Sequence, residues 1–254
     1  MLISKKEDKI FKIFLPKKTP NKMKFSIQKE SLLNLLTEHN KVVPLRTTLP
    51  ILSCAFVEVE KNNLLIKTTN LDQTIISTTK IKDEEKGTVA IPMNKLLEIV
   101  SALPNEEIKI ISNEDFLIEI NSNQGTYKIT GKSSEEFPEK NKTKTQKTIS
   151  LPSQDLIDII NKTTYATSKD DLKPALTGVY FNVKEGQITA VSTDGHKLVK
   201  YEKEIINPNK TEQSIIIPAK FLNILKNTIK QTGDVIINVD ENHITTKQKE
   251  FILI

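Results

Sequence analysis

The sequence predicts an α+β fold that is built twice in succession, and three observations support this prediction. The chain of 254 residues matches itself at a nearly constant offset. Four segments with apolar residues at helical spacing alternate with runs of strand-like residues. A polar stretch separates the two copies. Helices that lie on one side of antiparallel sheets define the α+β class.

The internal repeat is the strongest of these signals. Residues 50–59, Pro-Ile-Leu-Ser-Cys-Ala-Phe-Val-Glu-Val, align with residues 174–183, Pro-Ala-Leu-Thr-Gly-Val-Tyr-Phe-Asn-Val, at an offset of 124. Farther along the chain the offset is 126, so that Ile91-Pro92 aligns with Ile217-Pro218. An ordered series of matches at nearly constant spacing indicates a duplicated structural unit.

Each copy divides again into two similar halves, which makes each copy a duplicated βαβββ unit. Helices are predicted at residues 28–39, 93–103, 153–164 and 219–230. Three of them follow a proline (Pro92, Pro152 and Pro218), which is tolerated at a helix start because its missing N–H is not needed there. Asn94 and Ser153 are predicted to cap two of these helices.

Alternating apolar and polar residues predict the strands around these helices. The clearest candidates are Ala55–Glu60, Leu64–Thr68, Ile108–Ser112, Phe116–Ile120, Val179–Val183, Ile188–Val191 and Val235–Val239. Asn62-Asn63 and Glu185-Gly186-Gln187 are predicted to form hairpin turns.

The copies are joined by a predicted linker, Ser133–Lys147, which is rich in Ser, Glu, Lys and Thr. We therefore expect one domain over residues 23–140 and a second over 148–254. Residues 1–22 form a basic extension that we expect to be disordered, and Met23 is a candidate for the true start.

The second copy is shorter than the first at its end. Phe251–Ile254 corresponds to the first-copy strand that contains Tyr127–Ile129, but nothing corresponds to Gly131–Pro138. An apolar strand is an unusual end for a domain. The sequence therefore predicts that a further segment normally follows.

Composition excludes several classes of protein. Residues 1–22 hold seven lysines against Glu7 and Asp8, a net charge of +5, and because the whole chain is also +5, residues 23–254 are neutral. Any attraction for nucleic acid must then come from an uneven distribution of charge, with positive side chains on one face and negative side chains on another. The single cysteine, Cys54, permits neither an internal disulfide nor a cysteine-rich metal site. No apolar run approaches the roughly 20 residues of a membrane span, so a cytoplasmic protein without cofactors is expected.

The segment Thr193-Asp-Gly-His-Lys-Leu198 invites a catalytic interpretation, because aspartate and histidine together can move protons. A turn between strands explains Asp-Gly equally well, since glycine supplies positive φ and aspartate binds its own backbone. We favour a polar binding rim over catalysis. His39 and His243 have no second ligand at metal spacing, and we expect both on the surface, with no metal site.

Two features could meet phosphate groups. In the helix at 219–230, Lys220, Asn223, Lys226, Asn227 and Lys230 share one sector and no acid interrupts it. Arg46, the only arginine, lies in a loop that matches the loop of Lys173 in the second copy. An ordinary solvated face and an unpartnered loop cation remain open as alternatives.

Several motifs together resemble a known family. Met23-Lys-Phe-Ser-Ile27, Thr48-Leu-Pro-Ile-Leu52, Leu176-Thr-Gly-Val-Tyr-Phe181, Ser192-Thr-Asp-Gly-His-Lys-Leu198 and Ile217-Pro-Ala-Lys220 are similar to the β subunit of bacterial DNA polymerase III, the sliding clamp. The resemblance covers residues 23–254. It implies tandem clamp domains, with antiparallel sheets outside and two helices of each domain on the inner face of a ring.

The resemblance also implies a function without catalysis. Clamps of this family encircle duplex DNA without reading its sequence, and so make the replicative polymerase processive. The implied partners are double-stranded DNA, the polymerase III catalytic subunit, the clamp loader, other clamp-binding polymerases and repair proteins, and a second clamp chain in a homodimer.

The implied site residues fall into three groups. Arg46 matches a DNA-contacting position, with Lys173 and Lys220 as companions, and Lys226 and Lys230 extend the same basic helix. The hydrophobic cleft for partner peptides maps onto Leu176, Thr193, Gly195, His196, Lys197 and Leu198. Tyr127 and Ile129 match the strand at the dimer interface, with Lys95 nearby.

The chain also departs from the family pattern. Lys173 stands where the family often has arginine, and a third clamp domain, which supplies half of the cleft and of the dimer interface, is absent from the sequence. A truncated clamp is therefore the leading hypothesis. A peptide-binding scaffold that does not encircle DNA is the alternative, and an enzyme centred on Asp194 and His196 is the third.

Overall fold

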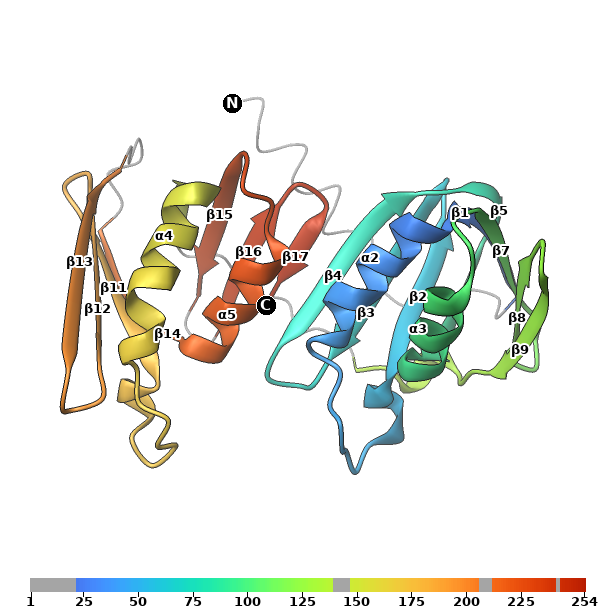
Figure 1. Cartoon of the computed structure of the whole chain (residues 1–254), viewed down its shortest axis with the longest axis horizontal. Helices are drawn as coiled ribbons and strands as arrows, with labels where there is room; N and C mark the ends of the chain where they lie inside the picture. Colours follow the sequence, from blue (N-terminus) through green and yellow to red (C-terminus); the bar gives the residue numbers. More distant parts are fainter. Residues whose placement is uncertain (1–21, 139–146, 206–211, 241–242) are drawn as a thin grey trace. The chain divides into compact units, whose positions relative to one another are not determined.

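A computed structural model describes residues 22–138, 147–205, 212–240 and 243–254. The described residues form two compact units, with the boundary between Lys142 and Thr143. Each unit is an antiparallel α+β structure with two helices (Figure 1), which confirms the predicted fold class.

The first unit contains two sheets, ordered β5-β1-β7-β8-β9 and β4-β3-β2-β6. Its elements are β1 (Met23–Gln28), α2 (Lys29–Asn40), the 3-10 turn η2 (Pro50–Ser53), β2 (Cys54–Glu60), β3 (Asn63–Thr69), β4 (Thr74–Lys80), β5 (Lys82–Glu85), β6 (Gly87–Pro92), α3 (Met93–Ala102), β7 (Glu107–Ser112), β8 (Leu117–Ser122), β9 (Gly125–Thr130) and η3 (Ser134–Glu136).

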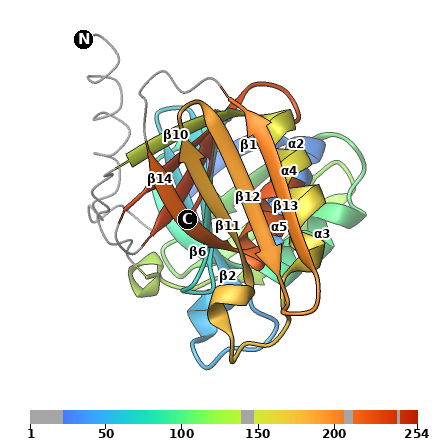
Figure 2. The same cartoon turned by 90° about the vertical axis from the view of Figure 1, so that its left-hand side faces the viewer.

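The second unit repeats this plan with sheets ordered β13-β12-β11-β14 and β10-β15-β16-β17. Figure 2 shows the first of these sheets face on. Its elements are β10 (Lys147–Pro152), α4 (Ser153–Thr163), η4 (Thr164–Ala166), η5 (Pro174–Leu176), β11 (Gly178–Lys184), β12 (Gln187–Thr193), β13 (Leu198–Glu204), β14 (Gln213–Pro218), α5 (Ala219–Thr228), β15 (Asp234–Val239), β16 (Ile244–Gln248) and β17 (Phe251–Leu253).

The two halves of each unit exchange their first strands. In the first unit, β1 pairs with β7 of the second half, while β6 pairs with β2 of the first half. In the second unit, β10 pairs with β15 and β14 pairs with β11 in the same way. Each half therefore completes the sheet of the other, so neither half can form its sheets alone.

Apolar faces of the helices close the cores. In the first unit, α2 buries Leu32 and Leu36 while α3 buries Leu96 and Val100. In the second unit the buried helical residues are Leu156, Ile157, Ile159, Ile160, Phe221, Leu222 and Leu225. Burial of each large side chain stabilises the fold by about 1.5–3 kcal/mol, which makes these helical stripes the main link between helices and sheets.

The predicted helix caps are wrong. Pro92 and Pro152 occupy the N-cap positions themselves, and no side chain caps either helix. The Ser153 hydroxyl instead donates to the carbonyl of Gly233 (2.6 Å) and accepts a hydrogen bond from the Gln248 amide (2.6 Å). The Ser153 hydroxyl therefore makes hydrogen bonds to residues far away in the sequence instead of capping the helix, and local sequence patterns do not reveal such contacts.

The hairpin turns lie at or near their predicted places. Lys61 and Asn62, with φ of 54° and 59°, make the β2–β3 turn one residue before the predicted pair. Glu185 and Gly186, with φ of 52° and 80°, make the β11–β12 turn. Positive φ at both central residues matches the right-handed twist of the flanking strands.

Part of the predicted linker packs on the first unit. Ser134–Glu136 form a 3-10 turn, and Phe137 is buried against Phe56 with their ring centroids 5.6 Å apart. Residues 139–146 of the predicted linker, like the extension over residues 1–21, lie outside the described residues. One aromatic side chain thus anchors a stretch whose composition is otherwise polar.

The two histidines differ. His243 is exposed, as predicted, with its Nδ1 3.7 Å from the Asp240 carboxylate. The expectation of a surface position for His39 is wrong, because its side chain is fully buried. His39 occupies the buried face of α2 together with Leu32 and Leu36, a placement that its polarity did not suggest.

Candidate functional site

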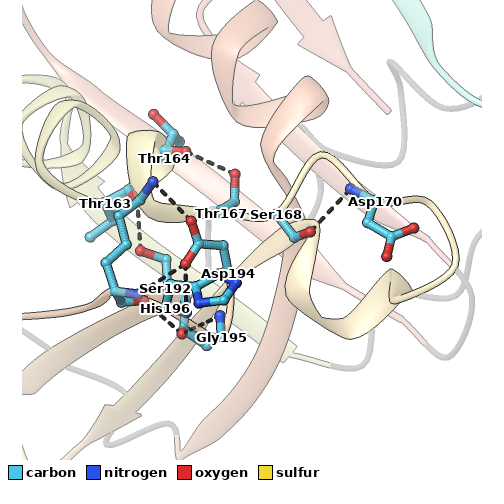
Figure 3. Close-up of polar contacts among 11 residues, drawn as sticks. Thr163, Thr164, Thr167, Ser168, Asp170, Ser192, Asp194, Gly195 and His196 are labelled. Atoms are coloured by element: carbon cyan, nitrogen blue, oxygen red, sulfur yellow. Dashed lines mark hydrogen bonds and ion pairs between the residues drawn. The ribbon is translucent and has the colours of Figure 1, made fainter.

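The turn between β12 and β13 is fixed by the side chain of Asp194. Its Oδ1 accepts hydrogen bonds from the backbone N–H groups of His196 and Lys197, each at 2.9 Å, and its Oδ2 lies 2.9 Å from the Lys197 ammonium (Figure 3). These donors hold the pKa of the Asp194 carboxyl well below its usual range. Gly195, with φ of 94°, supplies the left-handed conformation that the turn needs.

Further hydrogen bonds attach this turn to the end of α4. The Ser192 hydroxyl donates to the carbonyl of Thr163 (2.7 Å), the last residue of the helix. The Thr193 hydroxyl donates to the carbonyl of Lys197 (2.7 Å) and accepts from the N–H of Gly195 (3.0 Å). The turn is therefore a rigid rim, and the exposed imidazole of His196 projects from it (Figure 3).

A second connection, between η4 and β11, adjoins the same end of the helix. The N–H of Ser168 donates to the carbonyl of Leu176 (2.8 Å), and the N–H of Asp170 donates to the Ser168 hydroxyl (3.0 Å; Figure 3). The connection is closed on its other side by a hydrogen bond from the N–H of Ala219 to the carbonyl of Thr177 (3.1 Å). It therefore joins the end of α4 to the beginning of α5.

Large apolar side chains are exposed on these connections. Leu172 is 89% exposed, Leu198 67% and Tyr165 64%, while Leu176 is half-buried. Exposed apolar side chains on connections that adjoin one end of a helix are typical of a binding surface. We call these four residues, with Thr193–Lys197, the α4-end surface.

The α4-end surface, as defined, includes the six residues predicted for the partner cleft and two further exposed apolar residues that the sequence did not single out. Tyr165 lies in η4 and Leu172 in the following loop. Their only sequence signal is a large apolar residue in a segment otherwise predicted to be a polar loop. That signal is weak, because single exposed apolar residues are common.

The four α-helices of the described residues differ in the charges that they expose. Lys220, Asn223 and Asn227 of α5 are exposed, Lys226 is half-buried, and this helix contains no acid. The other three helices each contain at least one acidic residue. Only the α5 face therefore presents basic and amide groups without interruption.

The predicted basic residue Lys230 and a further helical lysine, Lys162, have other surroundings. Lys230 lies just beyond α5, which ends two residues earlier than predicted, and its backbone N–H donates to the side-chain oxygen of Gln248 (2.7 Å). Lys162 of α4 lies over the ring of Tyr201, with its Nζ 4.4 Å from the ring centroid. Lys230 is therefore an exposed residue beyond the end of the helix, whereas the Lys162 side chain packs against β13.

The loop cations Arg46 and Lys173 are both exposed, each in its own unit. Arg46 lies between α2 and η2, beside the 99% exposed side chain of Leu45. Lys173 lies between η4 and η5, on the connection already described. Each loop offers a cation to solvent near the C-terminal end of the first helix of its unit.

The residues predicted for a dimer interface have different environments. Tyr127 on β9 is 39% exposed, and Lys95 on α3 is exposed. Ile129 is 8% exposed and belongs to the core of the first unit. Within the described part of this unit, β9 is the last strand of its sheet, so its backbone edge and Tyr127 form the accessible surface there.

Among the described residues, no group of three or more histidine, cysteine, aspartate or glutamate side chains is arranged to hold a metal ion. No helix within the same residues is long and apolar enough to cross a membrane.

Comparison with known proteins gives a consistent result. Residues 23–141 match the model of the DNA polymerase III beta subunit, N-terminal domain, and residues 150–254 match that of the central domain. Curated relatives include the beta sliding clamps of Chlamydia pneumoniae (27% identical, over 91% of this chain) and Pseudomonas aeruginosa (28%, over 90%). The chain spans 63% of the length of each.

Solved structures agree with these relatives. The sliding clamp of Pseudomonas aeruginosa bound to griselimycin is 28% identical and superposes with a TM-score of 0.86. The sliding clamp of Bacillus subtilis is 25% identical, with a TM-score of 0.85. In each case the match covers 91% of this chain and 63% of the other chain.

Proposed function

Because the chain belongs to the DNA polymerase III beta subunit family, we propose that it forms part of a sliding clamp that holds a polymerase on duplex DNA. The observation that carries this proposal is the α5 face, where Lys220, Lys226, Asn223 and Asn227 occur without an acid. Such a face attracts phosphates without reading bases.

The proposed DNA contacts combine this helix with the two loops. Exposed Lys230 lies just beyond the end of α5, and Arg46 and Lys173 add one exposed cation in each unit. Residues 23–254 are neutral as a whole, so attraction depends on this local sorting of charge and should weaken as salt rises. Lys173 offers a point charge rather than the planar fork of an arginine.

The clamp would be retained on DNA because it encircles the duplex, rather than through its direct contacts with the DNA. A ring that encloses the duplex keeps its bound polymerase at a high effective concentration near the primer end. Closure requires a partner chain, for which β9 and Tyr127, with Lys95, provide the proposed contact in this chain. Ile129 would support that contact from the core.

The α4-end surface is the proposed docking site for peptides of the polymerase, the clamp loader and other clamp-binding polymerases and repair proteins. Its exposed leucines and tyrosine would pack against apolar anchor residues of the bound peptide. The turn of Asp194 provides fixed polar groups at the edge of the surface. No catalysis is proposed here. The Asp194 carboxylate is held in its charged form by three donors, which makes it a poor proton acceptor. A cytoplasmic location fits this role.

Retention on circular and linear DNA tests the proposal. The native protein, placed on nicked circular duplex by its clamp loader, should remain bound through gel filtration at moderate salt and be lost when the circle is cut. Equal retention on both forms would contradict topological binding.

The exposed leucines on the α4-end surface also favour one alternative, a peptide-binding scaffold that does not encircle DNA. It predicts peptide binding that survives Lys220→Glu, Lys226→Glu and Lys230→Glu together, with no retention on circular DNA.

A further inference from the structure

The dipeptide Asp194-Gly195 is chemically reactive as well as structural. In an Asp-Gly pair the backbone nitrogen of the glycine can attack the aspartate carboxyl group, because glycine has no side chain that crowds this nitrogen. Of the seven glycines in the chain, only Gly195 follows an aspartate, and none follows an asparagine, whose amide group reacts in the same way. The sequence therefore contains a single site of this kind.

The reaction needs no reagent other than water. The Gly195 nitrogen bonds to Cγ of Asp194, while the proton of the nitrogen and the hydroxyl of the neutral carboxyl group leave together as water, which closes a succinimide ring. Water then opens the ring at one of its two carbonyl groups. Cleavage between the nitrogen and Cγ restores aspartate. Cleavage between the nitrogen and the main-chain carbonyl carbon of Asp194 leaves isoaspartate, in which the main chain runs through Cβ.

The folded turn keeps the carboxyl group in its unreactive form. Loss of water requires a protonated carboxyl group, whereas the Lys197 ammonium, 2.9 Å from Oδ2 of Asp194, stabilises the ionised form. Oδ1 accepts hydrogen bonds from the N–H groups of His196 and Lys197, each at 2.9 Å (Figure 3). Because ring closure expels one of the two oxygens, it must break either the ion pair or both of these hydrogen bonds.

The attacking nitrogen is held by a second set of contacts. The N–H of Gly195 donates to the hydroxyl oxygen of Thr193 (3.0 Å), and this hydroxyl in turn donates to the carbonyl of Lys197 (2.7 Å). The nitrogen loses its proton when it bonds to Cγ, so ring closure must also break the hydrogen bond to Thr193. Both reacting groups are thus restrained by side chains of the same turn.

We propose that Asp194-Gly195 is a site of isoaspartate formation that the folded turn protects, with Lys197 and Thr193 as the protecting residues. Isoaspartate adds one carbon atom to the main chain and attaches the carboxylate directly to Cα. An isomerised turn therefore cannot keep the same hydrogen bonds to His196 and Lys197. The proposal is independent of the proposed clamp function, because it concerns only bonds within this turn.

Ageing of the purified full chain tests the proposal. The protein is kept in neutral buffer at physiological temperature beside a synthetic peptide of Glu185–Lys197, the tryptic fragment that contains the site. Chromatography of the digest separates the aspartyl and isoaspartyl forms of this fragment, and isoaspartyl methyltransferase labels only the second form. We expect the folded chain to form isoaspartate at least about tenfold more slowly than the peptide. Equal rates would overturn the proposal, as would a peptide that forms no isoaspartate.

Variants identify the protecting residues. Lys197→Ala and Thr193→Ala should each accelerate isoaspartate formation about fivefold, as expected for the loss of one surface ion pair or hydrogen bond. Lys197→Arg and Thr193→Ser keep the cation and the hydroxyl, and should react at the wild-type rate. Lys200→Ala is the charge-matched control, because Lys200 pairs with Glu202 on β13 instead of with the turn. Alanine variants of Lys197 and Thr193 that react no faster than wild type would overturn the proposal.

Global unfolding is the competing cause of faster reaction in the variants. Urea midpoints of unfolding distinguish it, because an alanine variant that reacts faster at an unchanged midpoint supports protection by the turn. Acceleration that appears only together with a lowered midpoint would overturn the proposal. Acceleration in Lys200→Ala equal to that in Lys197→Ala would overturn it as well, since net charge would then explain the effect.

Discussion

The Nδ1 atom of His39 lies 2.9 Å from the hydroxyl oxygen of Thr68 inside the first unit. That hydroxyl also lies 3.1 Å from the backbone carbonyl of His39, to which it donates. The hydroxyl must then accept from Nδ1–H, which leaves Nε2 unprotonated. Nε2 is buried and has no hydrogen-bond partner among the described residues, and burial lowers the pKa of His39 from 6.5 to about 3.

The first prediction concerns stability in acid. Between pH 6.5 and about 3 the unfolded chain binds a proton at His39 that the folded chain does not. The free energy of unfolding should therefore fall by about 1.4 kcal/mol per pH unit as pH drops below 6.5, from this group alone. Urea unfolding of His39→Leu should show a correspondingly flatter profile. His243→Leu, at an exposed histidine, is the control, and equal slopes in the two variants would contradict the prediction.

The second prediction concerns Phe137. Replacement by alanine removes its packing on Phe56 and its contact with Lys67, and should lower the free energy of unfolding by about 3 kcal/mol. Leu45→Ala, at a 99% exposed position, should change it by less than about 0.5 kcal/mol. Denaturant midpoints measure both. A Phe137→Ala protein as stable as wild type would show that the segment does not anchor there.

The third prediction concerns the buried amide of Gln248. Its Nε2 donates to the Ser153 hydroxyl (2.6 Å) and to the carbonyl of Lys230 (2.9 Å), and its Oε1 accepts from the N–H of Lys230 (2.7 Å). Gln248→Leu removes these three buried hydrogen bonds, while the Ser153 hydroxyl keeps its bond to the carbonyl of Gly233, and should cost about 2–3 kcal/mol of stability. Gln187→Leu, at an exposed position, should cost less than about 0.5 kcal/mol. Comparable losses in both would refute a specific role for Gln248.

The fourth prediction concerns DNA. Binding to duplex DNA should weaken less steeply with salt after charge reversal at Lys220, Lys226 and Lys230. The magnitude of the slope of log binding constant against log salt concentration should fall by about 2–3, because each phosphate contact contributes about 0.9 to it. Affinity for duplex DNA at low salt should fall for every sequence alike. The charge-matched control reverses Lys184, Lys200 and Lys249, which lie on strands and turns rather than on a helix. The same loss in the control would mean that only net charge matters.

The fifth prediction concerns the α4-end surface. Leu198→Asp should weaken binding of a polymerase-derived clamp-binding peptide about tenfold, because it places a charge where an apolar anchor would be buried. Stability should change little, since Leu198 is 67% exposed. Fluorescence anisotropy of the labelled peptide measures the effect, with Leu45→Asp as the control. Unchanged affinity in Leu198→Asp would move the docking site elsewhere.

Repetition and local periodicity were sufficient to predict the duplicated α+β plan. Leu32, Leu36, Leu96 and Val100 recur at helical spacing, and that spacing alone defines a buried stripe. The turn at Asp194-Gly195 was equally predictable, because its hydrogen bonds join residues within four positions of one another. The cleft residues at this turn came from motif resemblance, and their roles remain proposals.

Only the tertiary structure decided the features that depend on distant segments. The exchange of β1 and β6 between halves, the burial of His39 beneath Thr68 and the commitment of Ser153 to Gln248 each join residues that are far apart in the sequence. The environment of Phe56 likewise depends on a separate segment, Lys132–Pro138, which pairs with Ala90 and packs Phe137 on its ring. Local patterns report what a side chain prefers, whereas burial and hydrogen bonding depend on which other segments the fold brings beside it.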